Sequence, residues 1–408
     1  KRLKKIKRIN IFKSNKQQHT IMENKISSTR LFNASCFALI TTAMTFAIRV
    51  KLEMVFNQDY LLTLEEIGYA FAPAFWGFTL AMMIGGFFVD LFGMKKIMNI
   101  AFIGHLAGII VTILARDYIT LFWGTTLIGI ANGMVEAACN PLVATLYPNE
   151  KTKMLNRFHV WFPGGIVIGG VLGYIIMDLM GLSWMILAGT LLIPLLIYGF
   201  LFFKAQFPKT ERVTSGVSYN DMIKNCFQPL FIFMLLCMML TAATELGTTQ
   251  RIEGLLGKSL ESPILILVFI NGLMALGRLY AGEIVHKLSI TKVLLFSAVF
   301  SCLGLYLLAN TSGAMTFLSA AVFAIGVCYF WPTMLSFVAE KIPQTGALGL
   351  SLMGGAGMLS VSIVLPQMGK LMDENISGSD ALMIMAYIPA ILIVAFTLLH
   401  LYINRKNA

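Results

Sequence analysis

Long apolar segments alternate with short polar connections along almost the whole chain. Runs of about 18 apolar residues or more recur, and runs of this length predict helices that cross a membrane. We expect twelve such helices, at residues 31–56, 66–91, 97–114, 119–146, 158–179, 183–203, 228–249, 262–285, 291–309, 313–339, 346–369 and 379–403. The pattern therefore predicts an all-α membrane protein.

The longest polar connection divides these predicted helices six and six. We expect a six-helix bundle at residues 31–203, a linker at 204–227 and a second six-helix bundle at 228–403. The segments AACNPLVATLYP (137–148) and CYFWPTMLSFVAEKIP (328–343) resemble each other, and a glycine cluster follows each of them. Two repeated halves are typical of transporters that bind their solute between the halves and expose it to each side in turn.

Composition agrees with a membrane protein. The chain is 57% hydrophobic and 12% charged, whereas soluble domains are about 25% charged. Ten of the 31 Lys and Arg residues fall in the basic segment 1–30, and others gather in every second connection. Positive residues mark the cytoplasmic side. We therefore expect segment 1–30 and the tail 404–408 in the cytoplasm of a bacterial cell, with the helices in its inner membrane.

Charge and motifs also limit the partners that we expect. The net charge of +11 is spread over one face of a membrane protein, so we expect the lipid bilayer and a small solute as partners, and no nucleic acid. No phosphate-binding loop, HExxH motif or nucleophilic serine with a partner histidine is found. We expect a monomer that is not an enzyme, has no cofactor or metal, and is driven by an ion gradient. Residues 1–21 are either a lipid-binding tail or sequence upstream of a start at Met22.

One carboxylate lies near the middle of an apolar segment. Glu136, in the stretch NGMVEAACNP, is surrounded by about 25 mostly apolar residues, where a charge costs roughly 2.5–3.5 kcal/mol. Asn132 and Asn140 lie four residues before and after it, so the three share one helix face. This stripe can bind sugar hydroxyls, or it can form hydrogen bonds between helices.

The first predicted helix carries charges near its end. Arg49 and Glu53 are four residues apart and can form an ion pair. One interpretation is a structural pair near the outer interface, with Lys51 reaching toward the lipid headgroups. The other places Arg49 in the cavity, as a partner of Glu136 or of an acidic substrate, because a guanidinium can bond two oxygens at once.

Aromatic and titratable residues gather at the start of the fifth predicted helix. His159 is either a structural histidine or a group that binds substrate or carries a proton. Trp161 and Phe162 follow it and can face a sugar ring or serve as packing residues.

The second half adds its own candidates. Glu245 is its intramembrane carboxylate and a predicted substrate contact. Asn271, a further predicted substrate contact, lies seven residues before Arg278 on one helix face. Arg278 is nearer the cytoplasmic end, and there we expect it to act as a structural latch. Trp331 precedes a proline in YFWPT and can close the cavity.

The segment GGFFVDLFGMKK resembles the GxxxDxxGRR loop of the major facilitator superfamily. The matching residues are Gly86, Asp90, Gly93, Lys95 and Lys96. A degraded counterpart, GRLYAGEIVHKLSITK, begins around Arg278. The resemblance covers nearly the whole chain and implies the major facilitator fold, in which this loop latches the halves on the cytoplasmic side.

A narrower resemblance is to the fucose–galactose–glucose branch of that superfamily. It rests on EAACNP and LNRFHVWFPGG, with matches at Glu136, Asn140, Pro141, Leu155, Asn156, Pro163 and Gly165. His159 and Phe162 replace a glutamine and an asparagine of that branch, and Val50 stands where the branch has an aspartate. The resemblance implies a secondary transporter that imports a sugar-like solute with protons, with Glu136 as the coupling group.

Several alternatives remain open at this stage. Glu136 can exchange its proton with solvent, or it can be paired with Arg49. Glu136, Arg49 and Glu53 are the predicted proton-coupling residues. Sodium can replace the proton, and the solute can be an acidic sugar derivative bound by Arg49. An exporter of drugs or metabolites is a less favoured reading, as is a membrane sensor that does not transport.

Overall fold

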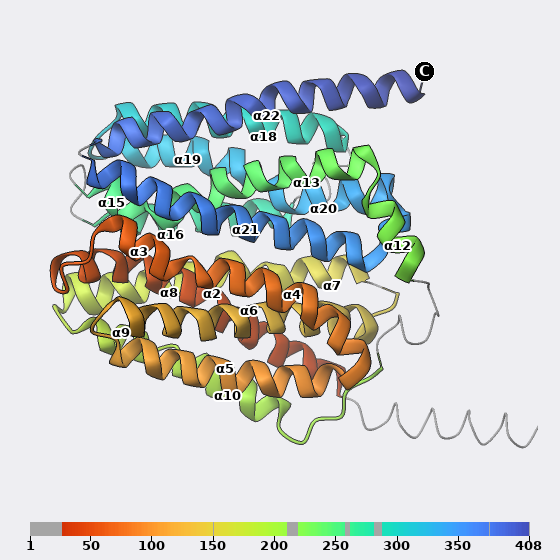
Figure 1. The fold of residues 1–408 in the computed structure, drawn as a ribbon, viewed down its shortest axis with the longest axis horizontal. Coiled ribbons are helices and arrows are strands. Elements are labelled where there is room, and N and C mark those ends of the chain that lie inside the picture. Colours follow the sequence, from red (N-terminus) through yellow and green to blue (C-terminus); the bar gives the residue numbers. More distant parts are fainter. Residues whose placement is uncertain are drawn as a thin grey trace, which may run out of the picture.

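The computed structural model describes residues 27–149, 151–209, 219–257, 262–280, 288–374 and 376–407. All regular secondary structure in these ranges is helical, which confirms the all-α prediction (Figure 1). We call residues 27–209 the N-terminal half and residues 219–407 the C-terminal half.

The N-terminal half consists of long helices and short connecting segments. Its elements are α2 (Ser28–Gln58), α3 (Leu64–Phe71), α4 (Pro73–Phe92), α5 (Met94–Leu114), α6 (Tyr118–Leu146), α7 (Lys151–His159), α8 (Trp161–Gly173), the π-helical η1 (Tyr174–Leu179), α9 (Trp184–Gly189) and α10 (Leu192–Phe202).

The C-terminal half repeats this arrangement with more interruptions. Its elements are α12 (Tyr219–Cys226), α13 (Pro229–Ala242), the π-helical η2 (Ala243–Gly247), α14 (Thr248–Gln250), α15 (Ile252–Leu256), α16 (Ile264–Leu279), α18 (Ile290–Asn310), α19 (Met315–Val327), α20 (Phe330–Lys341), the 3₁₀ turn η3 (Pro343–Thr345), α21 (Gly346–Asp373) and α22 (Gly378–Asn407).

Eleven helical segments of the described ranges are long and apolar enough to cross a membrane, and Ile264–Leu279 is a shorter apolar helix. Together they agree with the twelve predicted helices. The helix predicted at 262–285 is described only as far as residue 280. The helix predicted at 66–91 is observed as α3 and α4, because Pro73 lacks an amide hydrogen and begins a new helix there.

Each half is held together by close helix packing. α6 lies against α4 and α5, and α2 lies against α8, whereas α18 packs on α19 and α22 in the C-terminal half. Gly133 of α6 allows one of these approaches, because an added Cβ would overlap the carbonyl oxygen of Phe78 in α4. Small residues of this kind let two helix backbones come close inside a membrane.

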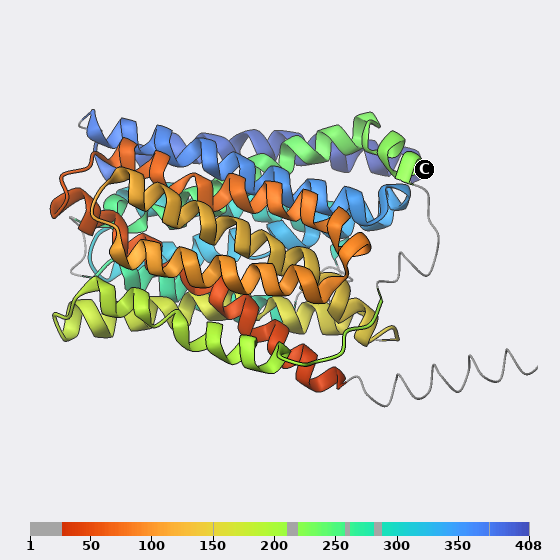
Figure 2. The same ribbon diagram turned by 60° about the horizontal axis from the view of Figure 1, so that its bottom comes forward.

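The two halves meet along three sets of helices. α3 and α4 pack on α21, α8 packs on α16, and α2 contacts α14 and α15 (Figures 1 and 2). The apolar core follows these contacts: Phe46 of α2 and Phe75 of α4 belong to the hydrophobic cluster of the C-terminal half. In Figure 1, α3 and α15 lie at the end opposite to α7 and α12. We call the end with α3 and α15 the outer end, because the charge distribution predicts that it faces outside the cell.

Candidate functional site

A hydrogen-bonded chain of three side chains joins α6 to α7. The amide nitrogen Nδ2 of Asn140 donates to Oε2 of Glu136 at 2.7 Å, and Nε2 of His159 lies 2.9 Å from Oδ1 of Asn140. Since Oδ1 can only accept, Nε2 carries the proton in this bond. Glu136 is buried, whereas Asn140 and His159 are half-buried. The spacing of four residues on α6 places Glu136 and Asn140 on one face, as the sequence predicts.

The C-terminal half presents a carboxylate paired with a guanidinium. Nη2 of Arg278 lies 3.5 Å from Oε1 of Glu245, and its Nε donates to the carbonyl oxygen of Cys328 at 3.3 Å. Glu245 lies in the π-helical turn η2, a type of irregularity that is frequent at functional sites. Asn271, by contrast, donates to the carbonyl of Leu267 in its own helix.

These two groups lie close together across the halves. The charged groups of Glu136 and Arg278 are both near enough to His159 to interact with it electrostatically, and α16 contacts α7. We call Glu136, Asn140, His159, Glu245 and Arg278 the polar cluster. The sequence pattern predicts that Arg278 belongs to a degraded loop motif. In the structure its side chain forms an ion pair with Glu245. Residues 281–287 of that motif lie outside the described part of the chain.

The aromatic candidates differ in their surroundings. Phe162 packs edge-on against Phe46 of α2, with ring centroids 5.2 Å apart. Trp331 is half-buried beside α21, where a Cβ added to Gly357 would lie 3.0 Å from its ring. Trp161 is 39% exposed and has the apolar surface needed to contact a solute or lipid.

Asn132 is not brought together with Glu136 and Asn140. Its side chain is fully buried, where Oδ1 lies 2.7 Å from Nε2 of His105 and Nδ2 donates to the hydroxyl of Thr45 at 3.1 Å. His105 in turn lies 2.9 Å from the hydroxyl of Tyr198. This network joins α2, α5, α6 and α10. The sequence offers only one weak signal for it, a single histidine within an apolar segment.

Arg49 and Glu53 of α2 form contacts with the other half rather than with each other. Arg49 does not pair with Glu53, which was the expected ion pair. Nε and Nη2 of Arg49 instead donate to Oε1 of Gln250 at 3.1 and 3.0 Å, and Glu53 lies 3.0 Å from Nη1 of Arg251. The physical reason is that α14 and the start of α15 lie against α2 and present these partners.

Lys51 is also paired rather than extended toward lipid headgroups. Its Nζ lies 2.8 Å from Asp178 of its own half and 3.1 Å from Glu253 of the other. Burial raises the pKa of the Glu253 carboxyl, and the Lys51 ammonium opposes that shift. We call the three pairs that join the halves here, Arg49–Gln250, Lys51–Glu253 and Glu53–Arg251, the outer closure.

Backbone contacts extend the outer closure to α3 and α21. Nη2 of Arg251 donates to the carbonyl oxygens of Leu64 and Leu365 at 2.8 and 2.7 Å. The carboxylate of Asp373 accepts from the amides of Leu64 and Glu65, at the start of α3. A carboxylate at a helix N-terminus is stabilised by the helix dipole. One buried arginine therefore binds α2, α3 and α21 together at the outer end.

The predicted loop motif spans the junction of α4 and α5. Gly93 separates the two helices with a φ of 84°, a conformation that glycine adopts without strain. Nζ of Lys95 donates to the carbonyl of Ala205 at 2.9 Å, and Lys96 lies above the ring of Phe92. Gly86 and Asp90 belong to α4, but their surroundings are outside the part that the structure describes.

No group of three or more His, Cys, Asp or Glu side chains in the described residues has the geometry of a metal site. The polar cluster offers proton-accepting and hydrogen-bonding groups, namely two carboxylates, one imidazole, one amide and one guanidinium.

Comparison with known proteins agrees with this fold. A family model described as Major Facilitator Superfamily matches residues 31–365, and a search of curated proteins finds no match. Among solved structures, the chain is similar to a mutant of the nucleoside transporter NupG, with 13% identity and a TM-score of 0.73 over 91% of this chain and 98% of that one.

Two further solved structures are also similar to this chain over most of its length. The xylose transporter XylE from E. coli, in a partially occluded inward-open conformation, is 13% identical with a TM-score of 0.71 over 90% of this chain and 96% of that one. The E. coli fucose:proton symporter FucP is 16% identical with a TM-score of 0.62 over 90% of this chain and 98% of that one. At these identities the likeness shows the fold.

Proposed function

The chain belongs to the Major Facilitator Superfamily, and we propose that within this family it imports a sugar-like solute together with protons. Family membership makes it an integral, multi-pass membrane protein and a secondary transporter with a small-molecule substrate, and it confirms that the chain is not an enzyme. The sugar, the proton and a bacterial inner membrane with cytoplasmic termini belong to the proposal.

The chain of bonds from His159 through Asn140 to Glu136 carries this proposal. Among the described residues, the buried carboxylate of Glu136 is held by one neutral amide, so it can accept a proton without breaking an ion pair with any of them. The imidazole and the amide can exchange their mutual bond for bonds to solute hydroxyls. Sugar recognition needs such donors and acceptors on a rigid scaffold, and α6 and α7 supply them.

Arg278 and Glu245 provide the second side of the proposed site. Their separation of 3.5 Å is long for a charge-assisted hydrogen bond, so a solute hydroxyl can insert between them at little cost. Because the two groups come from the C-terminal half, a solute that bridges them to His159 would couple binding to movement of the halves.

In the proposed cycle, Glu136 binds a proton while the site faces outward, and the solute binds next. The outer closure then forms through Glu53, Arg251 and their neighbours, and the site opens at the opposite end. Loss of the proton to the cytoplasm returns the carrier. The contacts of the outer closure are formed in the structure, and in the proposed cycle such contacts belong to states with a shut outer end.

The test is uptake by purified protein in proteoliposomes with an imposed proton gradient. We expect accumulation of a sugar from a panel of neutral, amino and acidic sugars, and we expect Glu136→Gln to abolish accumulation while counterflow of solute continues. Intact proton-driven accumulation by Glu136→Gln would contradict the coupling role. Uptake that responds only to a sodium gradient would replace the proton in the proposal.

A further inference from the structure

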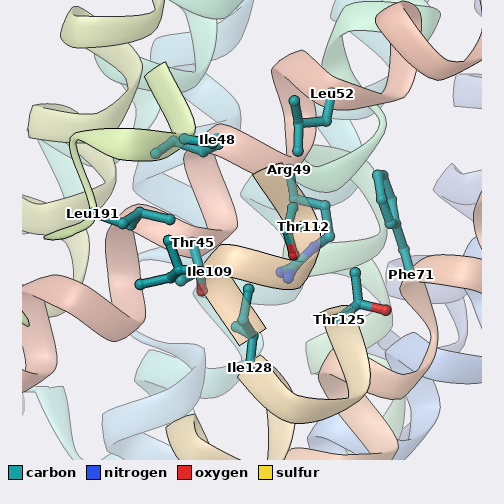
Figure 3. Close-up of a pocket in the computed structure, with 11 residues that line it drawn as sticks. Thr45, Ile48, Arg49, Leu52, Phe71, Ile109, Thr112, Thr125, Ile128 and Leu191 are labelled. Carbon is teal, nitrogen blue, oxygen red and sulfur yellow. The ribbon is translucent and has the colours of Figure 1, made fainter. Parts of the chain in front are cut away.

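A small cavity lies inside the N-terminal half, near the outer closure. Its volume is about 20 Å³, and its wall includes Thr45, Arg49, Thr112 and Thr125 among apolar neighbours (Figure 3). This volume suffices for one species the size of a water molecule. A sugar is far larger, so the cavity is not part of the proposed transport site.

Two groups in the cavity wall have hydrogen-bond donors that no described residue accepts. Arg49 donates through Nε and Nη2 to Gln250, and among the described residues Nη1 has no hydrogen-bond partner. The buried hydroxyl of Thr112 likewise has no hydrogen-bond partner in the described part of the chain. The hydroxyls of Thr45 and Thr125, in contrast, already donate to backbone carbonyls. The free donors at the cavity are therefore a guanidinium and one hydroxyl.

Among the residues that the structure describes, no carboxylate forms an ion pair with Arg49. The residue is 4% exposed, and its hydrogen-bond partner is a neutral amide. The rings of Phe46 and Phe75 lie 4.7 Å from its Cζ and interact with the cation only through their faces. Each of the other two basic residues of the outer closure, Lys51 and Arg251, has a carboxylate partner. Buried charges are normally paired, because burying an unpaired charge is costly. A negative charge beside Arg49 would therefore stabilise its buried guanidinium.

We propose that this cavity binds a small monovalent anion of chloride size, held by Arg49 and Thr112. A guanidinium and a hydroxyl both donate hydrogen bonds, which suits an anion and does not suit a metal ion. The apolar remainder of the wall suits a weakly hydrated halide better than a strongly hydrated oxyanion. Because Arg49 also holds Gln250 of the other half, the bound anion stabilises the state in which the outer closure is formed.

The test measures thermal unfolding of the purified protein in detergent while chloride replaces gluconate at constant ionic strength. Gluconate is too large for the cavity and serves as the reference anion. We expect an unfolding midpoint that is constant well below the Kd for chloride and rises by about 1–2 °C for each tenfold increase in chloride above it. Bromide should act like chloride, and sulfate should have no effect.

Three variants assign the effect to this cavity. Arg49→Gln and Thr112→Val should each remove most of the chloride dependence. Thr126→Val is the matched control, because the buried Thr126 hydroxyl donates to its own helix and does not line the cavity; it should keep the full dependence. If Arg49→Gln does not fold, Thr112→Val decides, since it leaves every charge in place.

Two results would overturn the proposal. One is a wild-type midpoint that does not respond to chloride, which means that the cavity holds water. The other is the same chloride response in wild type, Arg49→Gln and Thr112→Val, which means that the salt acts elsewhere. Crystals grown in bromide give an independent readout, because an anomalous peak beside Arg49 is required.

Discussion

Glu53 of α2 and Arg251, which precedes α15, form a buried ion pair across the two halves, with Oε2 and Nη1 3.0 Å apart. Arg251 is 1% exposed and holds two backbone carbonyls as well. Removing one partner of a buried pair leaves an uncompensated charge and costs about 3–5 kcal/mol. We therefore expect Glu53→Gln to weaken the state with a formed outer closure and to favour opening at the outer end.

The measurement is labelling from outside by an impermeant thiol reagent. The target is Leu246→Cys in a background without the six native cysteines, because Leu246 is buried beside Glu245. Glu53→Gln should increase the labelling rate about tenfold or more, which corresponds to a shift of at least about 1.4 kcal/mol. Glu53→Asp keeps a carboxylate beside Arg251 and should label more slowly than Glu53→Gln. Equal rates for both would show that the unpaired charge is not the cause.

Acid should partly rescue a variant that lacks Lys51. Burial raises the pKa of Glu253, so the folded state gains stability below the pKa of the unfolded chain and loses it as pH rises through the folded pKa. Lys51→Gln removes the opposing charge and leaves Glu253 facing Asp178, which raises that pKa further. At pH 7.5 the variant should unfold about 2–4 °C below wild type, and the gap should narrow at pH 5. A gap that is constant or wider at pH 5 would contradict this reading.

At the proposed site, the bond between His159 and Asn140 should matter more than the charge of His159. Glutamine at this position can still donate to Oδ1 of Asn140, so His159→Gln should retain proton-driven uptake within about tenfold of wild type. His159→Leu removes the donor and leaves the half-buried Oδ1 of Asn140 without this partner, at a cost of up to about 1–3 kcal/mol, and should lower uptake by about 10–100-fold. Uptake into proteoliposomes under an imposed proton gradient measures both. Similar loss in the two variants would mean that the imidazole carries the proton.

Asn132 should affect stability rather than solute affinity. Its amide completes a buried network with His105 and Thr45, so Asn132→Ala leaves His105 without a partner for Nε2 and should destabilise the protein by about 1–3 kcal/mol. The apparent affinity for the solute, measured from the concentration dependence of uptake, should not change in Asn132→Ala. Asn140→Ala should weaken this apparent affinity. A weaker apparent affinity in Asn132→Ala, at unchanged thermal stability, would place Asn132 in the site after all.

The contrast between Asn132 and Asn140 shows what the sequence can and cannot predict. Twelve apolar segments fix the helices, and a spacing of four residues puts both asparagines on the face of Glu136. Spacing within one helix carries no information about the neighbouring helix, however. Asn132 meets His105 and Asn140 meets His159 because of packing between helices. The pairing of Glu53 with Arg251 could not be predicted for the same reason, because the four-residue spacing of Arg49 and Glu53 concerns α2 alone.

Close backbone contact at the outer end leads to a final prediction, for Gly369 of α21. A Cβ added there would overlap the carbonyl oxygen of Leu64 and would lie 2.6 Å from Nη2 of Arg251. Neither the backbone nor the paired guanidinium can move without breaking the outer closure, so Gly369→Ala should cost that state about 1–3 kcal/mol. We expect faster labelling at Leu246→Cys and a lower unfolding midpoint.

Gly272 of α16 is the matched control for this glycine. It also lies inside a helix, but an added Cβ meets nothing within 4 Å. Gly272→Ala should leave labelling unchanged and stabilise the helix by up to about 1 kcal/mol. If the two alanine variants behave alike, the effect reflects helix propensity. If only Gly369→Ala opens the outer end, the close approach of α21 to α3 is what keeps that end closed.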